Sequence, residues 1–552
     1  MGFTGVSVAA TVTIECTPLP CRVVLIEEGI PGVVPLTGNA VTPIEHGAVG
    51  DGVVDDTVAM QAALTQCSTE NKICFIAKSK RYRITQPVFA WGDMDLIGED
   101  RLGWILLDYA VPTPFAVNMG ISAKQVPERP FTGKIDGVAF KVLGAPSLGR
   151  LLTFWRSDGA RVSNNYLDSD VYQYSLTQGQ NHNDWVNEGA GQKYIRRDIT
   201  IEDNHVVARD TTFGGEGIGI GLFDGVIIRR NRIHGGGDDP LGIHFCTNVE
   251  IYNNVIDSVE SRVFIANSTN VHIHHNKISR SASRLNKRWY PGQALIFVGF
   301  EIPKVWVGPG VYAPTNIVIE ENDLYYPSGA RDSSGAAIYL SAPRNVTVRN
   351  NRIVNDSPSV EAQGIAMWPV LGIPASAKWQ DPDGLDPFDT ANVYDVVIEG
   401  NILSGAYPQA INRVGDCSFY LGRVIVKGNT ARKHASDLTL LDCVPNMVVI
   451  DPHDSSDPAL LPPPDPPPPP PTEASLNCTE GVEIVDNLLR RWTYTTGGLI
   501  RIDGEPAPSP SAGGTLYLWA NNTIYNQAGG HWYKVVAGDF LVDFGPTKPV
   551  CP

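Results

Sequence analysis

The sequence predicts an all-β fold, a right-handed parallel β-helix, and two observations support this prediction. Short segments alternate apolar and polar residues and then reach an asparagine, as in VEIYNN and VHIHHN. This asparagine recurs at intervals of 27, 23, 22, 46, 29, 50 and 28 residues. The recurring positions are Asn204, Asn231, Asn254, Asn276, Asn322, Asn351, Asn401 and Asn429.

The alternation has a period of two, which places Val and Ile on one face of a strand and charged residues on the other. One such strand cannot bury its apolar face alone, so stacked coils must build a continuous core. The asparagine amides would then stack as a ladder at one turn. An antiparallel sandwich explains the alternation but not the recurring asparagine. Intervals of 22 to 27 residues fit one coil, and the longer intervals fit either one coil with an insertion or two coils.

The segment HGAVGDGVVDDTVAMQAAL, residues 46–64, predicts a short helix that caps the first coil. Asp55, Asp56 or Thr57 can cap the free N–H groups at the start of this helix. A β-helix needs such a plug because its first coil otherwise exposes the core and a sheet edge. We therefore assign Asp51, Asp55 and Asp56 a structural role.

The Gly-Asp-Gly turn and the Asp-Asp-Thr helix start resemble the opening of pectate-lyase-superfamily β-helix proteins, and the resemblance covers residues 40–450. It implies the solenoid fold and an elongated carbohydrate lying along its side. Members include lyases, hydrolases, epimerases and bacteriophage tailspikes, so the resemblance indicates fold more sharply than chemistry.

The chain divides into four predicted parts. Residues 1–40 form a β-rich anchor segment, and residues 41–450 form the β-helix with inserted loops. Residues 451–473 include PPPDPPPPPP, a semi-rigid polyproline linker. Residues 474–552 form a small β module rich in aromatic side chains.

Charge and composition exclude some partners. A net charge of −16 speaks against nucleic acid, and no apolar run approaches the roughly 20 residues of a membrane span. The N-terminus lacks the basic start and uninterrupted apolar core of a signal peptide. Nine cysteines allow four disulfides and one buried thiol, or nine reduced thiols. The sequence pairs are Cys16 with Cys21, Cys67 with Cys74, Cys417 with Cys443, and Cys478 with Cys551, which leaves Cys246.

The stretch GGGDDPLGIHF, residues 235–245, places two acids in a turn. Counted from the preceding ladder asparagine, Asp238 and Asp239 stand at +7 and +8, and Glu260 and Arg262 stand at +6 and +8 in the next coil. Neighbouring coils lie about 4.8 Å apart, so these four residues would form one stripe.

We predict that this stripe is catalytic. Carboxyl groups about 5 Å apart suit a retaining glycosidase, and a separation of about 6.5–9.5 Å suits an inverting one. Arg262 could bind an anionic sugar or keep a carboxylate charged. The structural alternative is a glycine-rich turn with solvated acids and a surface ion pair. The adjacent aspartates resemble those of polygalacturonase-type hydrolases, although that family's Gly-His-Gly and Arg-Ile-Lys segments are missing here.

Further residues are candidates for binding the substrate. Most of them are aromatic, and amphipathic rings suit surfaces that are partly exposed to water. Aromatic residues of the two long insertions could instead pack those insertions against the solenoid. The predicted substrate-binding residues are His244, Glu216, Trp289, Tyr290, Trp306 and Trp368. His272 and His274 alternate on one strand and could face outward together as a metal pair, but we favour an exposed polar face and predict no metal and no cofactor.

Three functions remain open. The first is a tailspike-like depolymerase of a bacterial surface glycan, a homotrimer on a virion tail that attaches through residues 1–40. The second is a secreted, monomeric lyase or hydrolase of uronic-acid polymers. The third is a non-catalytic glycan-binding spike. The first is favoured because small terminal modules flank one solenoid.

Overall fold

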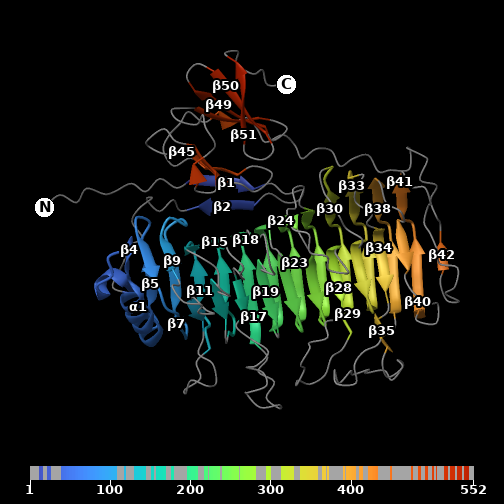
Figure 1. Ribbon diagram of the computed structural model, residues 1–552, viewed down its shortest axis with the longest axis horizontal. Coiled ribbons are helices and arrows are strands. Elements are labelled where there is room, and N and C mark those ends of the chain that lie inside the picture. Colours follow the sequence, from blue (N-terminus) through green and yellow to red (C-terminus); the bar gives the residue numbers. More distant parts are fainter. Residues whose placement is uncertain are drawn as a thin grey trace.

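The computed structural model confirms the predicted right-handed parallel β-helix. Three parallel sheets wind around one core, and helix α1 (Thr57–Glu70) lies at one end of the solenoid (Figure 1). The structure describes residues 39–108, 130–143, 151–154, 157–169, 196–208, 217–221, 223–235, 239–259, 262–280, 294–299, 313–328, 336–357, 363–368, 393–405, 410–413 and 420–432.

Most coils contribute one strand to each of three sheets, which contain 14, 13 and 11 strands because the terminal coils contribute to fewer sheets. The 14-stranded sheet comprises β3 (Ala40–Val41), β5 (Ile73–Ile76), β8 (Asp95–Gly98), β11 (Lys134–Asp136), β14 (Arg161–Ser163), β17 (Arg196–Glu202), β20 (Phe223–Arg229), β23 (Thr247–Tyr252), β26 (Thr269–His274), β29 (Thr315–Glu320), β32 (Arg344–Arg349), β37 (Val393–Glu399), β40 (Tyr420–Lys427) and β42 (Val448–Ile450). The 13-stranded sheet comprises β4 (Asp51–Asp55), β6 (Arg81–Ile84), β9 (Trp104–Asp108), β12 (Ala139–Leu143), β15 (Tyr166–Ser169), β18 (His205–Ala208), β21 (Arg232–Gly235), β24 (Val255–Val259), β27 (Lys277–Arg280), β30 (Asp323–Tyr326), β33 (Arg352–Asn355), β38 (Ile402–Gly405) and β41 (Thr430–Arg432). The 11-stranded sheet comprises β7 (Val88–Ala90), β10 (Val117–Met119), β13 (Leu152–Phe154), β16 (Leu176–Gln178), β19 (Ile218–Gly221), β22 (Leu241–His244), β25 (Val263–Ala266), β28 (Ala294–Gly299), β31 (Ala336–Ser341), β34 (Gln363–Trp368) and β39 (Ile411–Arg413).

Antiparallel strands occur outside the solenoid, in both terminal segments and in one insertion. Near the N-terminus β1 (Thr11–Glu15) pairs with β2 (Arg22–Ile26), and β35 (Val370–Leu371) pairs with β36 (Thr390–Ala391). The C-terminal strands form a five-stranded and a four-stranded sheet. They are β43 (Ala474–Ser475), β44 (Glu483–Val485), β45 (Arg491–Tyr494), β46 (Ile500–Ile502), β47 (Glu505–Pro506), β48 (Thr515–Trp519), β49 (Thr523–Ala528), β50 (His531–Val536) and β51 (Phe540–Gly545).

The alternating segments bury their aliphatic side chains as predicted. In β26, Val271 and Ile273 are 1% and 0% exposed, whereas His272 and His274 on the same strand are partly exposed. Burying one such Val or Ile contributes about 1.5–3 kcal/mol relative to leaving it in water. Because every coil stacks these side chains on those of its neighbours, one core runs along the whole solenoid.

The asparagine ladder is confirmed and has one more member than the sequence analysis found. Each ladder Oδ1 accepts hydrogen bonds from the backbone N–H and the Nδ2 of the asparagine one coil earlier, at 2.9–3.0 Å. Asn165 starts this run with the same contacts to Asn204, 39 residues later. The intervals of 46 and 50 residues also join directly bonded asparagines, so each is one coil with an insertion.

Left-handed backbone residues recur near the ends of strands in the 14-stranded sheet. The residue before a ladder asparagine has φ near +55°, as in Asp203, Arg230 and His275. Six residues before the ladder asparagine, Asn248 and Asn270 adopt a similar φ. Gly and Asn reach this region at the lowest cost, and they occupy several of these positions, as at Asn164, Asn253 and Gly400.

The N-terminal cap confirms that its acids are structural. Asp51 Oδ1 accepts from the N–H groups of Val53 and Val54, at 2.7 and 2.9 Å. Asp56 stands at the N-cap of α1, but its carboxylate binds the N–H groups of residues 49 and 50 instead of the helix. Asp55 Oδ1 accepts from the backbone N–H of Thr57 at 3.0 Å. These acids therefore hold the glycine turn against the helix start.

Three cysteines lie in the described part of the chain, and all three are buried thiols. Cys67 and Cys74, one of the four sequence pairs, are in contact but form no disulfide. The hydrogen bond to Cys67, together with burial, raises the pKa of the Cys74 thiol. Cys246 is buried within the repeat, as expected for the leftover thiol. The other three sequence pairs lie outside the described residues.

Candidate functional site

The structure brings Asp239 and Arg262 together at one edge of the 11-stranded sheet. Asp239 lies two residues before β22, and Arg262 immediately precedes β25 in the next coil. Arg262 Nε donates to Asp239 Oδ1 at 3.2 Å. The Asp239 side chain is 4% exposed and that of Arg262 is 19% exposed. A carboxylate buried to this degree requires a cationic partner, and Arg262 supplies it.

Arg262 also packs over two aromatic rings on the outer face of this sheet. Its guanidinium carbon lies 4.0 Å from the centroid of the Phe264 ring and 4.6 Å from that of Phe297. Both distances lie within cation–π range. The guanidinium is therefore fixed by one carboxylate and two rings, and its further N–H donors are available to bind oxygen atoms of a ligand.

The two rings belong to a column of outward-facing aromatics set by strand register. Phe264 pairs with Phe297 and Phe297 pairs with Tyr339 on successive strands β25, β28 and β31. The ring centroids of Phe297 and Tyr339 lie 4.8 Å apart, with the rings nearly parallel at 8°. Trp368, on β34, lies 5.7 Å from Tyr339. We call Phe264, Phe297, Tyr339 and Trp368 the aromatic column.

Only the last member of the aromatic column presents much of its surface to solvent. The first three rings are 4–8% exposed, because their faces pack on one another and on Arg262. Trp368 is 40% exposed. Among the described members of the aromatic column, the Trp368 ring is therefore the one that can stack on a sugar. The other three rings are packed and support it. His244 packs edge-on against Phe264, with centroids 5.4 Å apart.

Four of the ten predicted site residues thus lie on or beside one sheet face: Asp239, Arg262, His244 and Trp368. The remaining six fall outside the described residues. They are Asp238, Glu260, Glu216, Trp289, Tyr290 and Trp306.

A His–Asp pair was missed by the sequence analysis. His234 on β21 contacts Asp257 on β24 through Nδ1, and Arg232 Nη2 reaches the same carboxylate at 3.4 Å. Burial raises the pKa of Asp257, but the hydrogen bond and charge of His234 and the charge of Arg232 outweigh it and hold the pKa below its usual value. These strands lead into the turns that contain the predicted stripe. The 23-residue separation of the pair, equal to one coil, was the available signal.

The outer face of the 14-stranded sheet carries a second ordered array, which we call the outer charge ladder. Its members stand two residues before each ladder asparagine, and strand register pairs them in succession. Opposite charges meet along it, as in the pair Lys427 Nζ–Glu399 Oε2 at 2.7 Å. Its members are Ser163, Glu202, Arg229, Tyr252, His274, Glu320, Arg349, Glu399 and Lys427.

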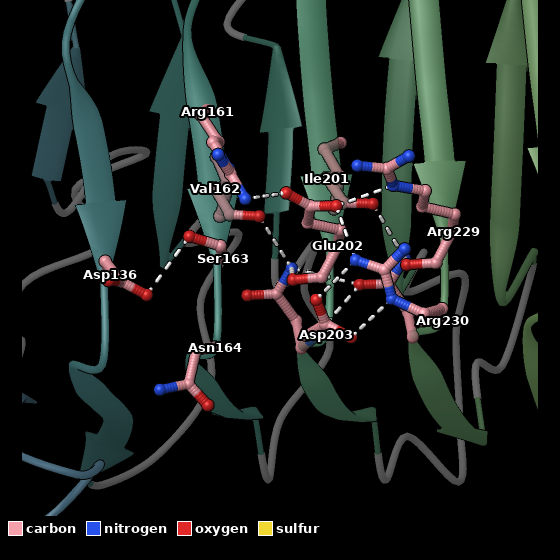
Figure 2. Close-up of polar contacts among 12 residues, drawn as sticks. Asp136, Arg161, Val162, Ser163, Asn164, Ile201, Glu202, Asp203, Arg229 and Arg230 are labelled. Atoms are coloured by element: carbon pink, nitrogen blue, oxygen red, sulfur yellow. Dashed lines mark hydrogen bonds and ion pairs between the residues drawn. The ribbon is translucent and has the colours of Figure 1, made fainter. Parts of the chain in front are cut away.

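Glu202 is the most strongly paired carboxylate of the outer charge ladder. Figure 2 shows it between Arg161, Arg229 and Arg230, and its Oε2 lies 2.6 Å from Arg229 Nε and 2.7 Å from Arg230 Nη2. Burial raises the pKa of Glu202, but the hydrogen bond from Arg229 and the charges of all three arginines lower it further, to below its usual value. A carboxylate held in this way favours a structural role over proton transfer.

No helix in the described part of the chain is long and apolar enough to cross a membrane.

Comparisons with known proteins agree with the fold. Residues 154–368 match the family described as Right handed beta helix region. A glucan 1,3-beta-glucosidase of Cochliobolus carbonum is 42% identical over 63 residues, which is 11% of this chain and 8% of that enzyme. The chain therefore spans a small part of the length of this curated relative.

Two solved structures illustrate the range of similar proteins. Tailspike protein 3 of bacteriophage CBA120 is 10% identical with a TM-score of 0.46, and the match covers 90% of this chain and 73% of the tailspike. PfbA, a surface adhesin of Streptococcus pneumoniae, is 14% identical with a TM-score of 0.43, and the match covers 84% of this chain and 98% of the adhesin. The strand topology and the family match to residues 154–368 agree on a right-handed parallel β-helix fold.

Proposed function

We propose that this protein binds an elongated glycan along the outer face of the 11-stranded sheet and cleaves it. The finer form of the proposal is a tailspike-like depolymerase of a bacterial surface glycan. The observation that carries it is the fixed Arg262, which is bonded to Asp239 and packed on the aromatic column that leads to the exposed Trp368. An arginine at one end of an aromatic column and a solvent-facing ring at the other suit a chain of sugars that carries negative charge.

The proposed chemistry uses two carboxyl groups on neighbouring coils. One protonates the glycosidic oxygen as the bond breaks, and the other activates a water molecule or attacks the sugar. Asp239 is nearly buried and paired with Arg262, which suits a carboxylate that acts as base or holds the arginine in place. Glu260, or Asp238 beside Asp239, is then the proposed acid. Arg262 orients the substrate.

The local likeness to a glucan 1,3-beta-glucosidase supports a carbohydrate substrate. It does not extend to the rest of that enzyme, so the proposed cleavage rests on the geometry of this chain. A homotrimer attached to a virion through residues 1–40 belongs to the same proposal. Sedimentation of the intact protein tests it, because a monomer would favour the secreted-enzyme alternative.

One observation favours a second function, a glycan-binding spike without catalysis. The Asp239 carboxylate is 4% exposed and already bonded, which restricts its access to a glycosidic bond. In that case the same face binds the glycan, and Arg262 and Trp368 carry the affinity.

The test incubates the protein with bacterial surface glycans and polyuronates and follows reducing ends and ultraviolet absorbance of unsaturated products together. Glu260→Gln and Asp239→Asn are compared with Asp323→Asn, a matched carboxylate that pairs with Arg352 on the 13-stranded sheet. Reducing ends without absorbance, lost in the first two variants alone, support the hydrolase. Absorbance that rises with the reducing ends indicates a lyase. Binding without cleavage supports the spike, and equal activity in all variants refutes the site.

A further inference from the structure

We propose that Glu250, His272 and His274 form a site for one divalent transition-metal ion of the zinc type, on the outer face of the 14-stranded sheet. Glu250 lies on β23, and the two histidines lie on β26 in the next coil. The site is separate from the proposed glycan face and does not depend on the proposed function. It also differs from the prediction of an exposed polar face without metal.

Both imidazole rings contact the same carboxylate oxygen of Glu250. Glu250 Oε2 lies 3.3 Å from His272 Nδ1 and 3.2 Å from His274 Nε2. Ligand atoms bound tetrahedrally to zinc at about 2.0–2.2 Å lie about 3.3–3.5 Å from one another. The measured contacts therefore match the edges of a zinc coordination shell. One ligand atom from each of the three residues also lies within 4.8 Å of the others.

The far nitrogen of each imidazole is held by a partner, as is usual for metal-bound histidines. His272 Nε2 lies 2.7 Å from Glu320 Oε1, and Arg349 binds the same Glu320 carboxylate. His274 Nδ1 lies 2.8 Å from His275 Nδ1, and His275 Nε2 lies 2.6 Å from Glu321 Oε2. Each chain of contacts ends on a carboxylate, which accepts the proton of the imidazole that faces it.

If both imidazole rings are neutral, three acceptors face one another across these contacts. If Glu320 accepts from His272 Nε2, the neutral ring has a lone pair on Nδ1. If His275 donates to Glu321, its Nδ1 accepts from His274, and His274 has a lone pair on Nε2. Both lone pairs then point at the Glu250 carboxylate, an arrangement that a bound cation stabilises.

The alternative is that both histidines carry two protons and donate to Glu250. That state places two positive rings in a stack with centroids 4.1 Å apart, which like-charge repulsion disfavours. A neutral pair is the form that binds a metal ion.

Binding requires a small rearrangement of the rings. They now stack at an interplanar angle of 28°, and their lone pairs must turn to converge on one ion. The torsion that turns an imidazole is broad, so this movement is inexpensive. Alternate residues of a strand face the same side, so the backbone of β26 already places both ligands correctly. Three protein ligands leave a fourth position for water, and the ion ties two neighbouring coils together.

The experiment titrates untagged, chelator-treated full-length protein with Zn²⁺ in a calorimeter and with Co²⁺ in a spectrophotometer. One equivalent of Zn²⁺ should bind and raise the thermal midpoint, and a chelator should reverse the shift. Co²⁺ should give visible ligand-field bands without the near-ultraviolet bands of thiolate ligands. His272→Gln/His274→Gln and Glu250→Gln should each lose at least tenfold in affinity.

The matched control is His234→Gln, which removes another partly exposed histidine bonded to a carboxylate one coil away, on the 13-stranded sheet. It should bind Zn²⁺ as the wild type does. Absence of binding by the wild type, thiolate bands with Co²⁺, or unchanged affinity in Glu250→Gln would overturn the proposal. If the double histidine variant fails to fold, Glu250→Gln and the Co²⁺ spectrum decide.

Discussion

The asparagine ladder makes a quantitative prediction about stability, and Asn254 is the position to test. This side chain is fully buried. Its Oδ1 accepts from Asn231 N and Nδ2, both at 3.0 Å. Its Nδ2 donates to the carbonyls of Ile228 and Tyr252 and to Asn276 Oδ1, at 2.9, 3.1 and 2.9 Å. Asn254→Ala removes all five contacts at once.

The cost follows from the groups that lose a bond. Asn231 Nδ2 still donates to Ile201 O and Arg229 O, and Asn276 Oδ1 still accepts from the backbone N–H of residue 254. The Asn231 backbone N–H loses Oδ1 of Asn254, and leaving such a buried donor unpaired costs about 1–3 kcal/mol. The two carbonyls each lose one further bond. We therefore expect the free energy of unfolding to fall by about 2–4 kcal/mol.

The assay compares denaturant unfolding and hydrogen exchange of wild type, Asn254→Ala and Asn270→Gly. Asn270 belongs to an exposed row of asparagines, where it donates to Asn248 Oδ1 at 3.1 Å and has φ near +56°. Glycine tolerates that backbone, so the control should change stability by less than about 0.5 kcal/mol. Exchange should accelerate at the Asn231 amide in Asn254→Ala alone. A change in Asn254→Ala no larger than in the control would refute the reasoning.

Three other side chains give separate tests, two on the proposed glycan face and one in the outer charge ladder. Arg262→Gln should weaken binding of an anionic glycan by about 10- to 100-fold, as expected for loss of a hydrogen bond between charged groups, and unchanged affinity in a binding titration would exclude the arginine. Trp368→Ala should weaken binding by about 2- to 10-fold without lowering the thermal midpoint, because its ring is 40% exposed. The lowered pKa of Glu202 means that its stabilising contribution is present above the ordinary value of 4.5 and is lost as the pH falls below it. The thermal midpoint of Glu202→Gln should therefore depend less on pH in this acid range than that of the wild type, and parallel profiles would contradict this.

Much of the fold was predictable because its determinants are local or periodic. VHIHHN predicts both the buried pair Val271 and Ile273 and the bonded Asn276, since alternation decides which side chains face inward. The structural role of Asp51 and Asp56 was predictable for the same reason, as their partners lie within seven residues, but Asp56 binds the preceding turn and not the helix it was expected to cap. Asn165 was missed because its interval to the next ladder member, 39 residues, hides the repeat.

The candidate site was less predictable. Counting from the ladder asparagines correctly placed Asp239 and Arg262 in neighbouring coils. The count gave no sign that Arg262 lies over Phe297, because an insertion separates them in sequence. The members of the outer charge ladder can be found in the sequence two residues before each ladder asparagine. Only the strand register shows that they contact one another.

The sequence by itself determined the solenoid, its inward and outward faces and its ladder, because period-two alternation and a recurring asparagine leave few other ways to bury the aliphatic residues. The tertiary structure alone decided which outward side chains touch. Stacking places coils one rung apart whatever the length of their insertions, and lengthening a loop adds little closure entropy. Sequence separation therefore says little about contact: His272 reaches Glu320 across 48 residues, as Cys246 reaches Ser268 across 22.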